Sequence, residues 1–286
     1  MTLLSSILLG LIQGIAEFLP ISSSGHLAIA ENLLNMSGAS EVPEFFDVLL
    51  HLGTLLAVFV AYWGDIYDMV VEFFHGVRDL AHRSTPVPVP PARRMILLII
   101  VGTLPLFAVL PIKDLVEGLA NNMYFVGGAL IVTGFLLFAS DRVRKGRKTE
   151  RSATMLDVLL VGVAQAIATC PGISRSGMTV AGSLYRRLDR ESAASYSFLL
   201  SVIAILGGLV ITLKDIADGG ASAANAANIG ALPLIVGFVV AAVSGYFAIR
   251  FMLNLLQKRK LRYFSWYVFC LGAFIMLDRA FLHLIF

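Results

Sequence analysis

One short motif occurs twice in this chain, and the two copies carry complementary reactive side chains. Residues 10–26 read GLIQGIAEFLPISSSGH, and residues 162–178 read GVAQAIATCPGISRSGM, so the copies align without a gap at an offset of 152. At three aligned positions an acid, a hydroxyl and an imidazole of the first copy are replaced in the second: Glu17, Ser23 and His26 stand opposite Thr169, Arg175 and Met178. The spacing predicts one composite site for an anion, with a reactive half and a cationic half.

Glu17 is the only carboxylate of the first copy and lies in an apolar segment. A carboxylate buried in such a segment is costly and marks a functional site by default. Gln13, four residues earlier, shares its helix face, and we expect it to bind substrate or to serve in packing. The competing interpretation of Glu17 is a structural ion pair with Arg175.

The run from Ser22 to Ser24, with Gly25 and His26, is expected to open a helix. One serine suffices as an N-cap, so the others are left for an anion, which helix N-termini also bind. Arg175 stands between two serines, and its planar guanidinium suits a phosphate. The further residues expected to bind substrate flank these side chains: Ser22, Ser24, Gly25, Ser174, Ser176 and Gly177.

This combination of side chains favours phosphoryl transfer. Arginine and helix N-termini stabilise phosphate charge, which is usually the largest catalytic term. The nucleophile stays open between Ser23, His26 and water, and His26 has the alternative of a satisfied core histidine. Glu17 is also the candidate ligand for Mg²⁺ or Ca²⁺, which prefer oxygen ligands. The sequence contains no ATP-binding P-loop motif.

The composition indicates a membrane protein. Hydrophobic residues make up 58% of the chain and charged residues 14%, against about 25% charged in soluble domains. The net charge of +3 argues against a nucleic-acid partner, and two cysteines provide neither a disulfide framework nor a metal cluster. We therefore expect membrane lipids to surround the protein.

Six apolar stretches are long enough to span a bilayer: 44–64, 92–112, 121–140, 190–213, 229–253 and 262–283. Residues 2–35 and 154–187 are apolar too, but each is broken by proline, glycine and serine. A break at membrane depth must be covered by protein or line a polar cavity. Both regions are therefore expected to form re-entrant helix hairpins.

Basic residues predict the orientation, because they gather in cytoplasmic loops. They crowd the segments 78–94, 142–151 and 258–262. Each half, 1–140 and 154–286, then contains one hairpin and three spans, and an odd number of spans inverts the second half. The predicted fold is a single all-α polytopic membrane domain built as an inverted repeat, with hairpin tips meeting near the midplane. Both termini and the site are expected outside the cytoplasm.

The motifs QGIAEFLPISSSGH and PGISRSG resemble the signatures of the undecaprenyl-diphosphate phosphatase family, also called the bacitracin-resistance family. The similarity runs along the whole chain. It implies a hydrolase that cleaves the terminal phosphate from a polyprenyl diphosphate and recycles the lipid carrier of cell-wall synthesis. It also implies a place in the bacterial inner membrane, and that Glu17 belongs to an (E/Q)xxxE motif, Ser23 and His26 to an SS(S/T)GH segment, and Arg175 to a PGxSRSG motif. Gln13 departs from members with two acids, which leaves its role open.

Two other functions share features with these motifs. Type-2 phosphatidic-acid phosphatases require a histidine after the arginine of their second motif, and SGMTVAGSLY after Arg175 contains none. A polyprenyl-phosphate flippase or transporter is the alternative, because transporters also use inverted repeats with broken helices. The oligomeric state stays open, with a homodimer among the options.

Overall fold

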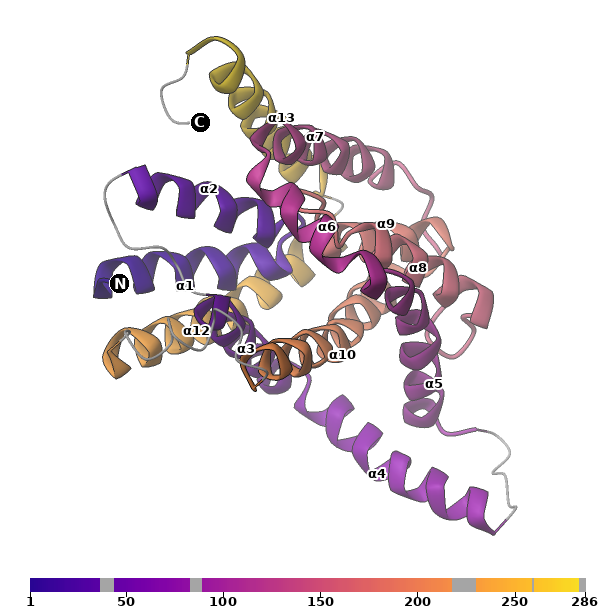
Figure 1. Ribbon diagram of the computed structural model, residues 1–286. Coiled ribbons are helices and arrows are strands. Elements are labelled where there is room, and N and C mark those ends of the chain that lie inside the picture. The colour runs from indigo at the N-terminus through magenta and orange to yellow at the C-terminus, as the bar shows by residue number, and fades with distance from the viewer. Residues whose placement is uncertain (37–43, 83–88, 218–229, 259, 283–286) are drawn as a thin grey trace.

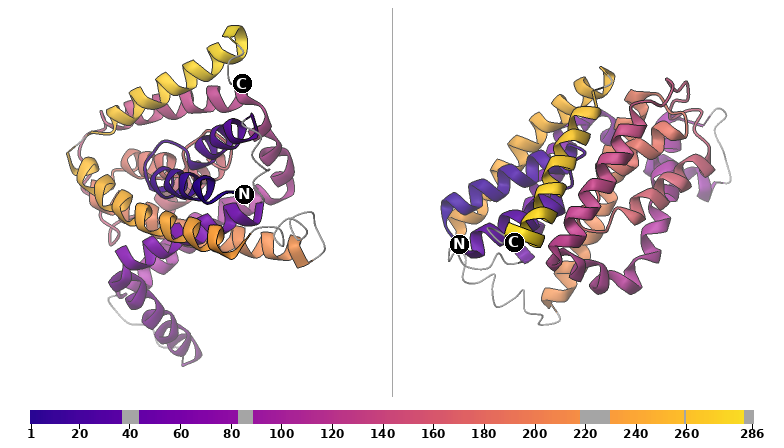
Figure 2. Two further views of the ribbon diagram at one scale, coloured as in Figure 1. Left: turned by 90° about the vertical axis from the view of Figure 1, so that its left-hand side faces the viewer. Right: turned by 90° about the horizontal axis from the view of Figure 1, so that it is seen from above.

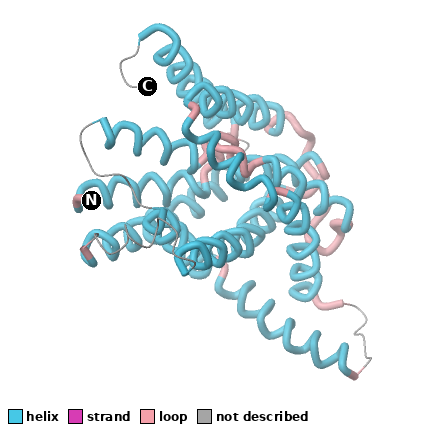
Figure 3. Tube along the Cα trace, viewed as in Figure 1, coloured by secondary structure: helices cyan, strands magenta, loops and turns pink. Residues whose placement is uncertain are grey.

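The chain folds almost entirely into helices joined by short loops. The computed structural model describes residues 1–36, 44–82, 89–217, 230–258 and 260–282. These parts of the chain contain no β-strand (Figures 1 and 3). Large apolar side chains such as Leu4 and Phe107 are exposed on the outside, as lipid-facing residues should be. The predicted class, an all-α polytopic membrane protein, is confirmed.

Within the described ranges, five helical segments are long and apolar enough to cross a membrane: Pro91–Asn121, Met123–Ser140, Arg190–Lys214, Ala231–Gln257 and Arg262–Phe281. The first begins with α5 (Pro91–Thr103) and continues through short 3₁₀ turns and α6 (Lys113–Gly118). The others correspond to α7 (Met123–Ser140), α10 (Arg190–Ala217), α12 (Ala231–Gln257) and α13 (Arg262–Leu277), which ends in a π-helical turn, Asp278–Leu282. The remaining expected span, 44–64, corresponds to α3 (Glu44–Ala61).

Helix α4 (Trp63–Ala81) was not predicted. The sequence predicted that the preceding span ends at residue 64 and that a loop follows it. Helix α4 is bent by 88° from α3 and projects from the body of the protein (Figure 1). Its apolar residues, including Val70 and Phe74, recur at helical spacing between acidic ones, which is the pattern of an amphipathic surface helix. Arg93 Nη2 of α5 holds it through Glu72 Oε2 at 3.0 Å and Asp79 Oδ2 at 2.9 Å.

The two broken regions form helix hairpins. The first consists of α1 (Leu3–Phe18) and α2 (Ser23–Met36), and the second of α8 (Met155–Ile167) and α9 (Arg175–Tyr185). The breaks fall at the predicted proline, glycine and serine residues. In the left view of Figure 2 the indigo α1 and α2 lie in the middle, with longer helices around them. The irregular tips are thus covered by protein, as membrane-buried backbone requires.

Contacts of the first hairpin have counterparts in the second. Helix α1 packs on α12 while α8 packs on α5, and α3–α10 and α7–α13 are further pairs. The aligned glycines Gly10 and Gly162 mark the two close approaches. A Cβ added to them would lie 2.7 Å from Gly237 O and 2.3 Å from Gly102 O, respectively. Small residues allow membrane helices to approach this closely. The first helix of each hairpin thus packs on a helix of the other half, as two related halves would produce. The inversion of the second half stays a prediction.

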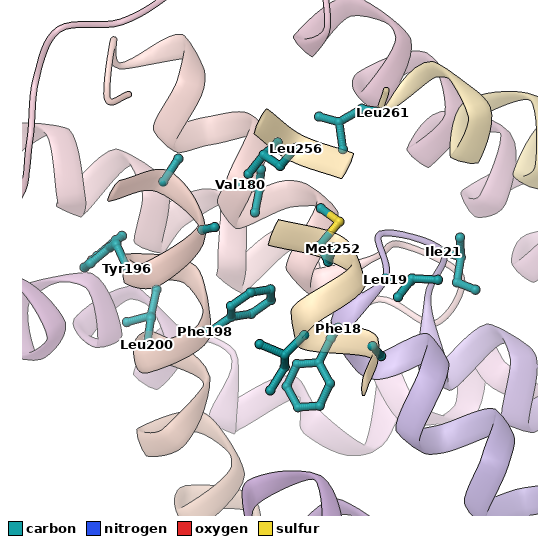
Figure 4. Close-up of a cluster of buried hydrophobic side chains, with 14 of the residues drawn as sticks. Phe18, Leu19, Ile21, Val180, Tyr196, Phe198, Leu200, Met252, Leu256 and Leu261 are labelled. Carbon is teal, nitrogen blue, oxygen red and sulfur yellow. The ribbon is translucent and has the colours of Figure 1, made fainter. Parts of the chain in front are cut away.

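A buried apolar cluster supports the tips (Figure 4). Phe18, next to Glu17 in the chain, packs edge-to-face on Phe198 of α10, with ring centroids 5.6 Å apart. Met252 of α12 is fully buried in the same cluster. Because interiors are close-packed and transmit strain, this cluster fixes the end of α1.

Described residues that flank the basic segments lie near one another at one end of the helices, whereas residues 83–88 and 259 of these segments lie outside the described ranges. Arg94 Nη2 donates to Ala153 O at 2.7 Å, joining the start of α5 to the loop between α7 and α8. Arg190 Nη1 donates to Leu256 O at 3.2 Å, joining the start of α10 to the end of α12. The loops expected on the cytoplasmic side thus share one end of the protein.

Candidate active site at the hairpin tips

The two hairpin tips contact one another. Ser176 Oγ at the start of α9 donates to Leu19 O at the end of α1, at 3.1 Å. A Cβ on Gly25 would lie 3.2 Å from Gly172 Cα, so only a residue without a side chain lets the tips approach without displacing backbone. Gly172 itself has φ +90°, a conformation that favours glycine. Of the two glycines predicted to bind substrate, Gly25 therefore lies at the contact between the tips, and so does Gly177, where a Cβ would lie 3.3 Å from Pro20 Cβ. Their binding of substrate stays a prediction.

Serines at equivalent positions cap both inner helices. Gly25 N–H donates to Ser22 Oγ at 3.2 Å, and Gly177 N–H donates to Ser174 Oγ at 3.1 Å. The serines two residues later lie 3.4 and 3.3 Å from these cap oxygens: Ser24 and Ser176. Because duplicated serines hold the hairpins in shape, the positions where the copies differ are left for chemistry.

Glu17 is the centre of the site, with a side chain only 3% exposed. Ser23 Oγ donates to Glu17 Oε2 at 2.7 Å, and Gln13 Nε2 donates to the same oxygen at 3.1 Å. Arg175 Nη2 from the other hairpin donates to Glu17 Oε1. The structure therefore brings the four side chains together. The ion pair between Arg175 and Glu17 is therefore present. Glu17 also accepts a hydrogen bond from the hydroxyl of Ser23, so it can act on that hydroxyl as well.

A cavity of about 350 Å³ opens at these residues, which is within the usual size range of small-ligand sites. Its wall contains Arg175, whose side chain is 24% exposed. Apolar residues of α10, among them Ile205 and Leu209, form another part. The polar and charged lining residues come from six helices and a hairpin tip: Glu17, Ser23, Ser24, His51, Lys113, Glu117, Thr169, Arg175 and Thr212. The cavity is therefore lined by charged residues, including Glu17 and Arg175, and by apolar residues of α10.

His51 of α3 is a functional candidate that the two tip motifs did not reveal, because it lies outside both of them. It lines the cavity, and its Nε2 lies 3.8 Å from Glu17 Oε2. Its Nδ1 donates to Asp47 O at 2.8 Å. The available signal was a polar stripe: Asp47, His51 and Thr54 recur at spacings of four and three in an otherwise apolar span, so they share one helix face.

His26 makes hydrogen bonds through both ring nitrogens, and its catalytic role stays a prediction. Its Nδ1 donates to Ser22 O at 2.8 Å, and its Nε2 accepts from the hydroxyl of Tyr267 on α13 at 2.8 Å. The two rings are stacked, with centroids 5.6 Å apart. His26 is not among the residues that line the cavity. It holds Ser22, whose φ of +73° is strained for a residue other than glycine.

The side chains that the structure describes offer no cluster of His, Cys, Asp or Glu for a resident metal ion. In the described ranges no three His, Cys, Asp or Glu side chains lie close enough to share one. Both oxygens of Glu17 already accept hydrogen bonds, from Ser23, Gln13 and Arg175. Hard cations take six or more oxygen ligands, so the coordination of Mg²⁺ or Ca²⁺ by Glu17 stays a sequence prediction without a ligand set to support it.

Comparison with known proteins decides the family. Residues 6–274 match the family of bacitracin resistance protein BacA. The chain belongs to this family. An undecaprenyl-diphosphatase of Carboxydothermus hydrogenoformans is 41% identical over 96% of this chain and 97% of that protein. One from Alkaliphilus metalliredigens is 40% identical over 97% and 98%, and undecaprenyl-diphosphatase 4 of Bacillus thuringiensis subsp. konkukian is 39% identical over 96% and 97%. The BacA family resemblance drawn from the two tip motifs is confirmed.

Proposed function

We propose that this protein is an undecaprenyl-diphosphate phosphatase. It hydrolyses the lipid diphosphate to undecaprenyl phosphate and inorganic phosphate, which recycles the lipid carrier for cell-wall synthesis. The observation that carries the proposal is the contact of Glu17 with a hydroxyl from one tip and a guanidinium from the other. The names of the relatives, over nearly their full lengths, support the same activity.

Ser23 is the nucleophile in this proposal. Its Oγ–H already points to Glu17 Oε2 at 2.7 Å, so the carboxylate takes the proton as Oγ attacks the terminal phosphorus. The phosphorus–oxygen bond to the lipid monophosphate breaks, and that group leaves with the bonding electrons. Arg175 and the N-termini of α2 and α9 stabilise the charge that develops on the phosphate oxygens. His26 supports the reaction by holding the turn at Ser22.

The divalent cation enters as part of the substrate. A diphosphate carries enough oxygens to bind Mg²⁺ or Ca²⁺ without a protein ligand cluster. A substrate-borne cation would leave Glu17 with its hydrogen-bond partners.

The lipid and the site face the extracytoplasmic side of the inner membrane. The cavity extends to Lys113 and Glu117 of α6, in a segment that carries few basic residues. The crowded basic residues that precede α5, precede α8 and follow α12 lie at the opposite end of the helices. Their number favours a cytoplasmic position for that end. The apolar wall formed by α10 suits an isoprenoid chain. All the site residues come from one chain, so the mechanism does not require a homodimer.

Phosphate release in detergent tests the proposal against a flippase. Purified protein should release inorganic phosphate from undecaprenyl diphosphate without a sealed bilayer. Glu17→Gln should not release it, because the proton acceptor is lost. Transport of polyprenyl phosphate across vesicles, without phosphate release from the diphosphate by the parent protein in detergent, would favour the flippase.

A further inference from the structure

We propose that His51 is the base for the second half of the reaction, in which water hydrolyses the phosphorylated serine. The proposal rests on the function given above, since it requires a phosphoserine at Ser23. It assigns a role to a residue that lies outside both tip motifs and comes from α3.

The hydrogen bond at Nδ1 fixes the state of the imidazole. A backbone carbonyl can only accept, so Nδ1 must carry the proton that it donates to Asp47 O at 2.8 Å. In the neutral ring Nε2 then keeps its lone pair. The same bond also fixes the ring orientation, with Nε2 turned toward the cavity and Glu17.

The distance between Nε2 and Glu17 Oε2 indicates a place for water. At 3.8 Å it is too long for a direct hydrogen bond. Two acceptors that face one another need a donor between them, and one water molecule can donate to both. Glu17 Oε2 is also the partner of Ser23 Oγ at 2.7 Å. Water held by His51 would therefore stand beside a phosphoryl group on Ser23.

The other histidine of the tip region cannot take this role in the same geometry. His26 uses Nδ1 for Ser22 O and Nε2 for the hydroxyl of Tyr267, and it does not line the cavity. The charged groups that share the cavity with His51 come from α1, α6 and α9: Glu17, Lys113, Glu117 and Arg175.

The two half-reactions balance with these groups. In the first, the proton of Ser23 passes to Glu17 as phosphoserine forms and the lipid monophosphate leaves. In the second, water oxygen bonds to phosphorus, its proton passes to His51 Nε2, and the bond from phosphorus to Ser23 Oγ breaks. Ser23 Oγ recovers its proton from Glu17. Inorganic phosphate leaves, and His51 returns its proton to solvent through the cavity.

A rapid-quench experiment on His51→Gln separates the two half-reactions. Glutamine is polar but cannot accept the proton, so the variant should form about one equivalent of undecaprenyl phosphate per enzyme rapidly. Steady-state phosphate release should then be slowed about 10²-fold or more, the usual contribution of a general base. Label from the terminal phosphate should remain on the protein. His51→Asn, whose amide can still donate to Asp47 O, serves as the second variant in case glutamine disturbs folding.

His82→Gln is the matched control. His82 makes the same bond to a carbonyl four residues earlier, Nδ1 to Arg78 O at 2.8 Å, but it lies at the exposed end of α4. This control should behave as the parent. Turnover of both His51 variants within about threefold of the parent, or slow turnover without a burst, would overturn the assignment. Absence of phosphate release from the parent would instead refute the proposed function.

Discussion

Replacing Arg175 with lysine tests the anion clamp most sharply, because the charge is kept and the planar fork is lost. Turnover should fall about 10²–10³-fold, since one preorganised donor to transition-state charge is worth about 2.7–4 kcal/mol. Arg175→Ala also removes the cation paired with Glu17, which is 3% exposed. Breaking such a buried pair costs about 3–5 kcal/mol. The alanine variant should therefore lose activity and melt at a lower temperature.

The assay is phosphate release from undecaprenyl diphosphate at saturating substrate in detergent, together with thermal melting. Arg186→Lys is the control, because Arg186 Nε donates at 2.8 Å to Asp157, which is fully buried and remote from the cavity. That variant should lose some stability but keep turnover within about threefold of the parent. Turnover of Arg175→Lys within the same limit would refute the clamp.

Glu17→Gln should abolish phosphate release at neutral pH, whereas Gln13→Ala, which removes one hydrogen bond to the carboxylate, should slow it about tenfold; equal effects would contradict the assignment of the base. A cysteine added after Met1 or before Phe286 should react with an impermeant reagent on intact cells, and one near Lys145 should not; the reverse pattern would overturn the inverted repeat. Chelator should stop phosphate release and added Mg²⁺ or Ca²⁺ should restore it, while calorimetry of the protein without lipid should show no tight cation site. Tight stoichiometric binding there would contradict a substrate-borne ion.

Much of the fold follows from the sequence, because membrane spans and their interruptions leave strong patterns. Apolar stretches near 20 residues predicted the long helices, and the breaks at Pro20 and Gly172 predicted the hairpins. Helix α4 was not predicted because charged residues interrupt its apolar ones, and its Arg78 was counted among the basic residues of a loop. Its amphipathic spacing was the signal for a helix.

The site was only partly predictable. The alignment of Ser23 with Arg175 indicated the positions where the copies had diverged, and the structure places both on Glu17. The approach of His51 depends on how α3 packs against α1, which motif spacing does not encode. The partner of His26, Tyr267, is 241 residues away, so its position could not follow from its neighbours in the chain.

In the proposed mechanism Glu17 activates Ser23 for attack on a phosphate held by Arg175. Tracing the transferred phosphoryl group tests this mechanism directly. Undecaprenyl diphosphate with a ³²P-labelled terminal phosphate is mixed with the protein and quenched within one turnover, once in acid and once in base. Because phosphoserine survives acid and phosphohistidine survives base, peptide mapping identifies the acceptor. Acid-stable label is expected on Ser23 and should be absent from Ser23→Ala. Turnover without labelled protein, or base-stable label on His26, would contradict this mechanism.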